Sequence, residues 1–303
     1  MSKINVCITC DNNYAKYAGV TIASILFNSL ESDLYKFYIV SDSITDEYKD
    51  VIKQLSNIKN FEIEFIYPEK YLFGEYKNTK TTDYLPLASF YRLKLATLIP
   101  NEDKIIYLDC DTVVNTSLSS LFDINIDNYF CAGVKDVGYK RLGKRLGLTQ
   151  EQTYINSGVL LINLKKWRED NAELKLSDFA KEHPEKLSLG DQDLINICFA
   201  NEILLLDGKW NVQVVNFCSR SDYSNNFKIL HYMGGSKPWK MGSYIPLKKY
   251  YFKYLKMTQW ESPDIIWHLK SNILGSLLYF KHRPLFMFRP GFFKSLFYLL
   301  IRK

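Results

Sequence analysis

The sequence predicts an α/β protein with a mainly parallel central sheet and a helical appendage at its C-terminus. Over residues 3–66, short apolar runs alternate with segments that have the apolar spacing of helices. Strands that alternate with helices are typical of parallel sheets, because parallel neighbours need a long crossover connection. Residues 104–108 are apolar on both faces, as in a central parallel strand.

The elements follow from the periodicity of the apolar residues along the chain. We expect strands at residues 3–9, 36–40, 61–66, 104–108, 158–164 and 203–206. We expect helices at residues 14–30, 45–55, 87–98 and 265–280. Residues 71–83 are polar, rich in lysine and without a period, which indicates a loop beside a site.

Composition and charge exclude several classes of protein. The chain has 303 residues, 47% of them hydrophobic, which is enough for one large domain with a substantial core. The net charge is +6, but seven Lys or Arg residues and no acid lie between Ile265 and Lys303, so the body is close to neutral. A neutral body disfavours nucleic acid as a partner, whereas a basic, aromatic tail favours an anionic lipid surface.

The start of the chain and its cysteines bear on localisation. The sequence opens on Met1-Ser2-Lys3 without an apolar signal segment, and no run reaches the ~18 apolar residues of a membrane span. Cys7 and Cys10 form an isolated CxxC whose members face opposite sides of a strand, so we interpret them as small buried apolar residues. We expect a cytoplasmic protein, peripheral on the inner face of the cell membrane.

Two acids follow the apolar strand at 104–108 directly. Asp109 and Asp111 are two residues apart, a spacing that points both side chains to one side of a strand. Ligands of open α/β sheets bind where strands end, and paired carboxylates repel each other unless a cation lies between them. Oxygen ligands suit Mn²⁺ or Mg²⁺. The pattern favours a metal site over a turn with two solvated acids.

The segment from His231 to Trp239 contains groups that suit a metal-bound diphosphate. The imidazole of His231 can complete a Mn²⁺ shell with two carboxylates. Gly234 and Gly235 allow the backbone to approach a ligand closely, and Lys237 can neutralise a diphosphate oxygen. The alternative for this segment is a surface loop whose histidine is satisfied locally.

Six segments, in this order and spacing, resemble family 8 glycosyltransferases, and most of all the bacterial lipopolysaccharide galactosyltransferase and glucosyltransferase branch. They are Cys10–Tyr14, Arg92, Tyr107–Asp111, Ile155–Leu164, Asp191–Asp193 and His231–Trp239. The match covers about residues 3–240. It implies the Rossmann-like GT-A fold, with a catalytic domain over residues 1–243 and a basic, aromatic region over residues 244–303 for peripheral membrane attachment.

The resemblance also implies roles for individual residues. Contacts with the nucleotide and diphosphate are implied at Thr9, Asp11, Asn13, Arg92, Asp109, Cys110, Gly234 and Lys237. A Mn²⁺ site is implied at Asp109, Asp111 and His231. Donor-sugar contacts, and with them the catalytic residues, are implied at Asn156, Asp191 and Gln192, with Gln192 nearest the reacting face. Asp136 is a candidate for donor or acceptor hydroxyls, or a loop aspartate without a role.

The implied activity is the transfer of galactose or glucose from a UDP-sugar to a surface glycan such as lipooligosaccharide, with retention. The leaving UDP takes up negative charge, which Mn²⁺ and Lys237 would stabilise. The sugar becomes oxocarbenium-like. Because Gln192 is an amide and a poor nucleophile, we favour a front-face route, in which the acceptor hydroxyl attacks on the side of the departing group.

Three other functions stay open as alternatives. A nucleotidyltransferase would need a Gly-rich basic loop after the first strand, where this chain has Asp11-Asn12-Asn13. A self-glucosylating primer of the glycogenin kind would need an acceptor tyrosine on its own surface, and the chain has 22 tyrosines. A non-catalytic nucleotide-sugar or lectin-like module would show a degraded motif, but all the metal-ligand positions are present here.

The C-terminal tail carries two apolar stripes. The first falls at helical spacing at Ile266, Leu269, Ile273, Leu277 and Phe280, and the second lies within residues 292–300. Nine aromatic residues accompany the seven cations of this tail. Such a segment is typical of peripheral attachment to an anionic membrane, and the alternative is a small helical cap packed on the body.

Overall fold

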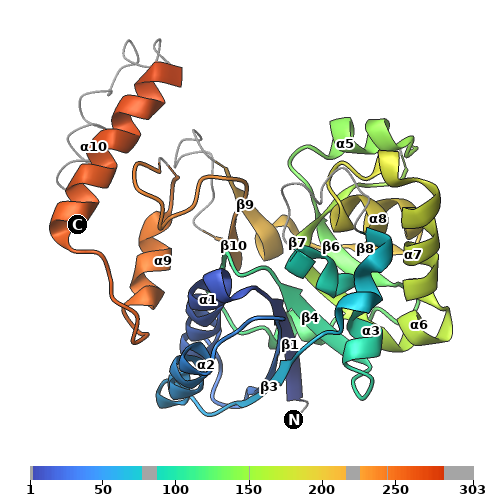
Figure 1. The fold of residues 1–303 in the computed structure, drawn as a ribbon, viewed down its shortest axis with the longest axis horizontal. Coiled ribbons are helices and arrows are strands. Elements are labelled where there is room, and N and C mark those ends of the chain that lie inside the picture. Colours follow the sequence, from blue (N-terminus) through green and yellow to red (C-terminus); the bar gives the residue numbers. More distant parts are fainter. Residues whose placement is uncertain (1–2, 77–86, 150, 216–225, 244, 283–303) are drawn as a thin grey trace.

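In the computed structural model of the chain, the described residues are 3–76, 87–149, 151–215, 226–243 and 245–282 (Figure 1). Part of the expected loop at 71–83 and all of the second apolar stripe of the tail lie outside these ranges. The side chain of Phe280 also lies outside the description.

A seven-stranded sheet forms the centre of the molecule, in the order β3-β2-β1-β4-β7-β6-β8. Its strands are β1 (Lys3–Thr9), β2 (Leu34–Val40), β3 (Glu62–Ile66), β4 (Lys104–Leu108), β6 (Cys131–Lys135), β7 (Ile155–Asn163) and β8 (Ile203–Leu205). β7 runs antiparallel to both of its neighbours, and the other pairs are parallel. The prediction of a mainly parallel α/β sheet is confirmed.

A second sheet of three short strands, in the order β5-β10-β9, lies beside the first. It consists of β5 (Thr112–Val114), β9 (Val212–Val214) and β10 (Ile229–Tyr232). β10 pairs antiparallel with β5, and the register places His231 opposite Thr112. This pairing brings His231 next to Asp111, although more than a hundred residues separate the two in the sequence.

Helices cover both faces of the central sheet (Figure 1). The α-helices of the described residues, including the two C-terminal ones, are α1 (Ala15–Phe27), α2 (Asp46–Lys53), α3 (Leu95–Leu98), α4 (Ser119–Phe122), α5 (Tyr139–Leu146), α6 (Leu164–Glu169), α7 (Ala172–Glu182), α8 (Asp191–Cys198), α9 (Lys248–Leu255) and α10 (Ile265–His282). Short 3₁₀ turns are η1 (Asn12–Tyr14), η2 (Gln54–Asn57), η3 (Lys70–Tyr76), η4 (Leu87–Lys94), η5 (Pro184–Lys186) and η6 (Gly208–Asn211).

Each face of the sheet carries its own apolar cluster, because successive side chains of a strand alternate between the faces. Ile4, Val6 and Ile8 of β1 pack with α1 and α2 on one face. Cys7 packs on the other face with η4, α6, α7 and α8. Cys10 belongs to the first cluster, so the two cysteines of the CxxC are buried on opposite sides, as expected.

The structure differs from the prediction at residues 87–98, where an α-helix was expected. Residues Leu87–Lys94 form a 3₁₀ helix, and only Leu95–Leu98 are α-helical. Residues 90–93 are all buried, whereas a regular surface helix buries one stripe and exposes the other. The tighter winding of this segment places Arg92 inside the protein.

The C-terminal helices differ in how they contact the body. α9 packs through Tyr251 and Tyr254 into a third apolar cluster with Val20 of α1 and Leu230 of β10. α10 stands away from the sheet (Figure 1). Its contacts include a hydrogen bond from the Gly242 amide to Ser271 Oγ (3.0 Å). No helix among the described residues combines the length and hydropathy needed to span a bilayer.

The side chain of Lys248 makes a pH-dependent contact between α9 and α10. Its ammonium donates to Asn272 Oδ1 (2.7 Å), and burial lowers its pKa from 10.5 to about 8. The unfolded chain keeps the ordinary pKa, so the stability contribution of this group is present above pH 10.5 and is lost as the pH falls through about 8.

We expect Lys248→Met to raise the free energy of unfolding at pH 7 by about 1–3 kcal/mol, because a thioether carries no desolvated charge. Urea unfolding at pH 7 and pH 10 measures this, with the exposed neighbour Lys249→Met as the control. The gain should shrink at the higher pH. An equal gain in stability at both pH values would contradict the lowered pKa of Lys248 as its cause.

Candidate active site

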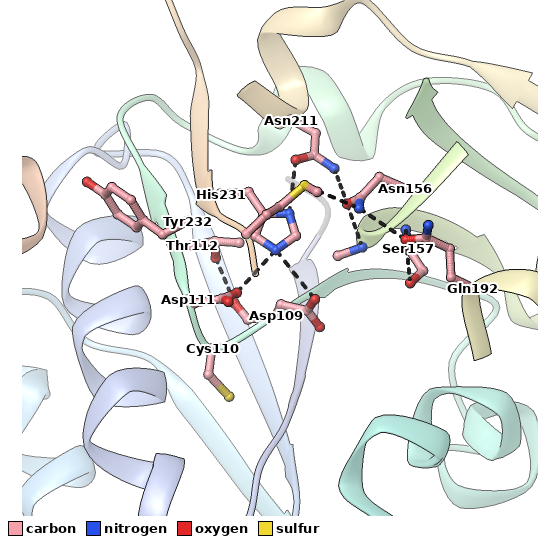
Figure 2. Close-up of polar contacts among 12 residues, drawn as sticks. Asp109, Cys110, Asp111, Thr112, Asn156, Ser157, Gln192, Asn211, His231 and Tyr232 are labelled. Carbon is pink, nitrogen blue, oxygen red and sulfur yellow. Dashed lines mark hydrogen bonds and ion pairs between the residues drawn. The ribbon is translucent and has the colours of Figure 1, made fainter. Parts of the chain in front are cut away.

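Asp109 and Asp111 lie in the turn that leaves β4 and enters β5, between the two sheets. The expectation that they share one strand is wrong, because β4 ends at Leu108 and the chain turns there, with the Thr112 amide donating to the Asp109 carbonyl (3.3 Å). The two carboxylates nevertheless face the same imidazole. His231 Nε2 lies 3.6 Å from Asp109 Oδ2 and 3.2 Å from Asp111 Oδ1 (Figure 2).

The second ring nitrogen of His231 is bound by a residue that the sequence did not indicate. His231 Nδ1 lies 3.2 Å from Asn211 Oδ1, an acceptor that selects the tautomer with its proton on Nδ1. The lone pair of Nε2 is then directed at the two carboxylates, which is how outer-shell partners orient a metal-binding histidine. Asn211 ends a 3₁₀ turn and belongs to no regular pattern of apolar residues, so the sequence pattern did not indicate its role.

These three residues fit a divalent cation. One ligand atom from each of Asp109, Asp111 and His231 lies within 4.8 Å of the others. Asp111 Oδ1 is buried and has no hydrogen-bond donor of acceptable geometry, although Nε2 is near. Buried acceptors that face one another without a proton between them are unfavourable, and a cation relieves that repulsion.

A neighbouring cation keeps Asp111 ionised. The ammonium of Lys237 contacts Asp111 Oδ2 and donates to the Tyr232 carbonyl (2.8 Å). Burial acts to raise the pKa of Asp111, but the positive charge of Lys237 outweighs it and holds the pKa well below its ordinary range. Trp239 stacks on Tyr17 of α1 (ring centroids 3.7 Å apart), which holds the segment that carries Lys237 against the body.

Arg92 is buried between two acids. Its guanidinium lies 2.9 Å from Asp109 Oδ1 and 3.1 Å from Asp191 Oδ2, and it donates to the Ser157 carbonyl (2.8 Å). Burial opposes its charge, but Asp109 and Asp191 raise its pKa above the ordinary value. Burial raises the pKa of Asp191 to about 6 even though Arg92 acts in the opposite direction. Arg92 therefore orients Asp109 while it neutralises Asp191.

A chain of amides connects the imidazole to Gln192. Asn211 Nδ2 donates to Asn156 Oδ1 (2.8 Å), and Asn156 Nδ2 donates to Gln192 Oε1 (3.1 Å) (Figure 2). Both Asn156 and Gln192 also donate to Asp136 Oδ2, at 3.2 and 3.3 Å. The structure thus brings Asn156, Asp191 and Gln192 together and adds Asp136 to them.

A cavity of about 200 Å³ opens beside the carboxylates. Its lining includes most of the residues expected at the nucleotide, namely Thr9, Asp11, Arg92, Asp109, Cys110 and Lys237, together with the expected metal ligand Asp111. Cys10, Tyr14, Ala88 and Ser89 also line it, although no ligand contact was expected at these four residues. The Cys110 thiol donates to the Thr9 carbonyl (3.1 Å), so this side chain is turned toward β1.

Two expected nucleotide contacts lie elsewhere. Asn13 is exposed within η1 and is not part of the cavity lining. Gly234 is exposed as well, with φ +71°, a left-handed conformation that favours glycine. Asp11 lines the cavity, but its Oδ1 also accepts from the Tyr14 amide (2.9 Å) and so caps the turn. A ligand reaching Asn13 or Gly234 would have to extend beyond the cavity.

The comparisons with known proteins decide the family. Residues 5–242 match the model of glycosyl transferase family 8. The chain belongs to this family. Among similar proteins, general stress protein A of Bacillus subtilis is 29% identical over 272 residues, covering 84% of this chain and 94% of that protein. A lipopolysaccharide 1,2-glucosyltransferase of Escherichia coli is 27% identical over 275 residues, covering 85% and 79%.

A solved structure supports the fold of this family 8 glycosyltransferase. The galactosyltransferase LgtC, crystallised with donor and acceptor sugar analogues, superposes with a TM-score of 0.73 and 22% sequence identity. The match covers 87% of this chain and 99% of that one. The expected GT-A fold is therefore confirmed. The family match over residues 5–242 makes the chain a glycosyltransferase.

Gly158 of β7 tests the packing of the candidate metal site. A Cβ at this position would lie 2.7 Å from Asp109 Oδ2 and 2.7 Å from His231 Nδ1. We expect Gly158→Ala to displace these side chains and to weaken Mn²⁺ binding by about 10–100-fold. Isothermal titration with Mn²⁺ measures this, with Gly74→Ala as the control, since that Cβ would meet nothing within 4 Å. Unchanged affinity in Gly158→Ala would show that Mn²⁺ binds elsewhere.

Proposed function

We propose that this glycosyltransferase moves galactose or glucose from a UDP-sugar to a surface glycan such as lipooligosaccharide, in a Mn²⁺-dependent reaction that retains the anomeric configuration. The observation that carries the proposal is the convergence of Asp109, Asp111 and His231 beside the cavity that contains Thr9 and Asp11. The lipopolysaccharide glucosyltransferase among the similar proteins supports this class of acceptor.

The residues around the cavity would have different roles in the proposed reaction. Asp109, Asp111 and His231 would hold the metal, with Mg²⁺ as a possible substitute for Mn²⁺. A bound metal ion supplies positive charge to the leaving diphosphate. Lys237 adds a second positive charge at the same place, and its contact with Asp111 keeps it within reach.

The amide cluster would bind the donor sugar. Asn156 and Gln192 share the carboxylate of Asp136, so their remaining donors and acceptors are oriented before a sugar arrives. An amide is a poor nucleophile, and Asp191 is occupied by Arg92. We therefore propose front-face transfer, in which the acceptor hydroxyl attacks on the side of the departing UDP. Intact mass spectrometry that trapped a sugar ester on Asp136 or Asp191 would contradict this route.

The test of the proposed function is UDP release across a panel of UDP-sugars with Mn²⁺. We expect release from UDP-galactose or UDP-glucose, its loss on chelation with EDTA, and its return when Mn²⁺ is restored. Intact mass after the reaction separates transfer to an external acceptor from self-glucosylation of a tyrosine. Absence of UDP release with every sugar and every divalent metal would overturn the proposal.

We also propose that residues 1–243 form the catalytic domain and that residues 244–303 attach it to the inner face of the membrane. Within the second region α9 packs on the body, so the attachment would begin with α10. The expected stripe of α10 is exposed at Ile266 (56%), Ile273 (49%) and Leu277 (61%). An exposed apolar stripe on a helix supports a membrane surface more than a packed cap.

Vesicle sedimentation tests the attachment. We expect Ile266→Gln/Ile273→Gln/Leu277→Gln in the full chain to lower binding to phosphatidylglycerol vesicles by about tenfold or more, because each substitution removes buried apolar area. The matched control is Leu30→Gln/Leu174→Gln/Leu205→Gln, which changes three exposed leucines of the body. Equal vesicle binding by the two variants would contradict membrane attachment through α10.

A further inference from the structure

Helix α5 carries a cluster of cations that the proposed reaction does not use. Four of its eight residues are basic (Lys140, Arg141, Lys144 and Arg145), and none is acidic. Lys135, at the end of β6, adds a fifth cation just before the helix. In Figure 1 the helix lies at the upper right, and the ion pair of Arg145 with Asp193 joins it to α8, which begins with Asp191 and Gln192.

Both ends of α5 are attached to the amide cluster of the candidate active site. Before the helix, Asp136 Oδ1 accepts from the Gly138 amide (2.7 Å) while its Oδ2 accepts from Gln192 (3.3 Å). Near its end, Arg145 pairs with the fully buried Asp193 (2.5 Å). Tyr154 donates to Asp193 and accepts from Gln192 (3.2 Å). The position of α5 is therefore fixed relative to Gln192.

Among the described residues, the other three cations of α5 have no acidic partner. Leu142 and Gly143 are buried, whereas Lys140, Arg141 and Lys144 are exposed. Across the described ranges, no carboxylate oxygen comes within 4.0 Å of these three side chains, whereas Lys166 of α6 has two acidic partners. Folding makes no evident use of their charge.

Part of this charge arrangement is unfavourable for the isolated helix, although Lys144 and Arg145 lie in the last turn, where the helix dipole favours cations. Lys140 and Lys144 are four residues apart, a spacing at which like charges destabilise a helix by about 0.2–0.5 kcal/mol. Lys140 and Arg141 lie in the first turn, where the helix dipole disfavours cations. An anionic ligand would remove both penalties.

We propose that the exposed face of α5, formed by Lys140, Arg141 and Lys144, binds a phosphate or carboxylate group of the acceptor, so that the acceptor is an anionic glycan. This inference rests on the proposed function, since it assigns the acceptor side of the same site. Arg141 can bind a phosphate through two parallel hydrogen bonds, and the lysines act as point charges. Tyr139, half-buried between Lys135 and Lys140, offers a ring face to a neighbouring sugar.

A charged anchor at α5 would orient the acceptor. Because α5 is joined to Asp136 and Gln192, an acceptor held by its anionic group would be held at a fixed position relative to the residues that would bind the donor sugar. Positioning of this kind contributes to both affinity and rate. It also predicts that acceptor binding weakens as salt is added, since exposed charges are screened over about 10 Å at 0.1 M ionic strength.

The test is a glycan array with fluorescently labelled full-length protein, in the presence of UDP and Mn²⁺. The array carries oligosaccharides with phosphate, with carboxylate and without charge. We expect the anionic glycans to bind and the neutral ones to bind at least about tenfold more weakly. Lys140→Gln/Arg141→Gln/Lys144→Gln should lose this preference, and the charge-conserving Lys140→Arg/Arg141→Lys/Lys144→Arg should keep most of it.

A charge-matched control separates local binding from net charge. Lys53→Gln/Lys165→Gln/Lys181→Gln removes three exposed cations from α2, α6 and α7 and should bind the array as the unmodified protein does. Equal binding of neutral and anionic glycans, absence of binding to any anionic glycan, or an equal loss in both glutamine variants would overturn the proposal. The proposal would also be overturned if Lys140→Gln/Arg141→Gln/Lys144→Gln bound phosphatidylglycerol vesicles more weakly but bound the anionic glycans as the unmodified protein does.

The proposed function and the acceptor inference fail separately. Hydrolysis of the donor, in which water takes the sugar in place of a glycan and UDP is released, reports on the first, and the array reports on the second. Unfolding midpoints of all variants show whether a loss of binding comes from misfolding. A protein that releases UDP but binds neutral glycans best would retain the proposed function and exclude the anionic acceptor.

Discussion

Asp111→Asn is expected to lower Mn²⁺-dependent UDP release by about 10²–10³-fold, with little change in the shape of the site. The amide has the size of the carboxylate but no charge to offer a cation. It also turns an acceptor into a donor, facing either His231 Nε2 (3.2 Å from Oδ1) or the ammonium of Lys237. UDP release at saturating UDP-sugar measures the loss, and a higher Mn²⁺ concentration should recover part of it.

The control for this substitution is Asp123→Asn, an exposed aspartate at the end of α4. It should release UDP at the rate of the unmodified protein. If Asp111→Asn kept full activity at low Mn²⁺, the ion would have to be held by other residues, and the cavity beside Thr9 and Asp11 would need another explanation.

Arg92→Met is expected to lower the free energy of unfolding by about 3–5 kcal/mol, because it leaves Asp191 buried without a counter-charge. The loss should depend on pH. Burial already raises the pKa of Asp191 to about 6, and the loss of Arg92 raises it further. A carboxyl with a raised folded-state pKa contributes stability that is present below its unfolded pKa and is lost as the pH rises through the folded one. The deficit should therefore be smaller at pH 5 than at pH 8.

Urea unfolding at the two pH values measures this effect. Arg168→Met is the matched control, since Arg168 pairs with the exposed Asp103 (2.9 Å), and surface pairs contribute about 0–1 kcal/mol. Adding Asp191→Asn to Arg92→Met should recover part of the stability, because it removes the uncompensated charge. A deficit that stays the same at both pH values, with no recovery in the double variant, would contradict the role given to Arg92.

The periodicity of the chain was enough to predict the parallel half of the fold. β1, β2, β3 and β4 are apolar runs separated by helices, and the spacing of apolar residues is a local property. The antiparallel direction of β7 could not be predicted from periodicity, because an apolar run does not show whether the neighbouring strands run parallel or antiparallel to it. The second sheet was missed because β5 and β9 have three residues each, too few to establish a period.

The sequence indicated which residues of the site could bind a metal or a diphosphate, and the structure showed which of these residues lie close together. Asp109 and Asp111 could be predicted as candidate metal ligands from their place after a buried strand, although they lie in a turn and not on one strand. The approach of His231 depends on the pairing of β10 with β5, which is a long-range contact. Asn211 orients the imidazole through that same contact, and an isolated asparagine carries no sequence signal of such a role.

The most direct test of the metal site is electron paramagnetic resonance of Mn²⁺ bound in the presence of UDP, recorded on the intact protein and on His231→Gln. We predict a single tightly bound ion that shows coupling to a histidine nitrogen, and loss of that coupling in the variant. A tightly bound Mn²⁺ without nitrogen coupling, or one whose spectrum is the same in His231→Gln, would contradict the account.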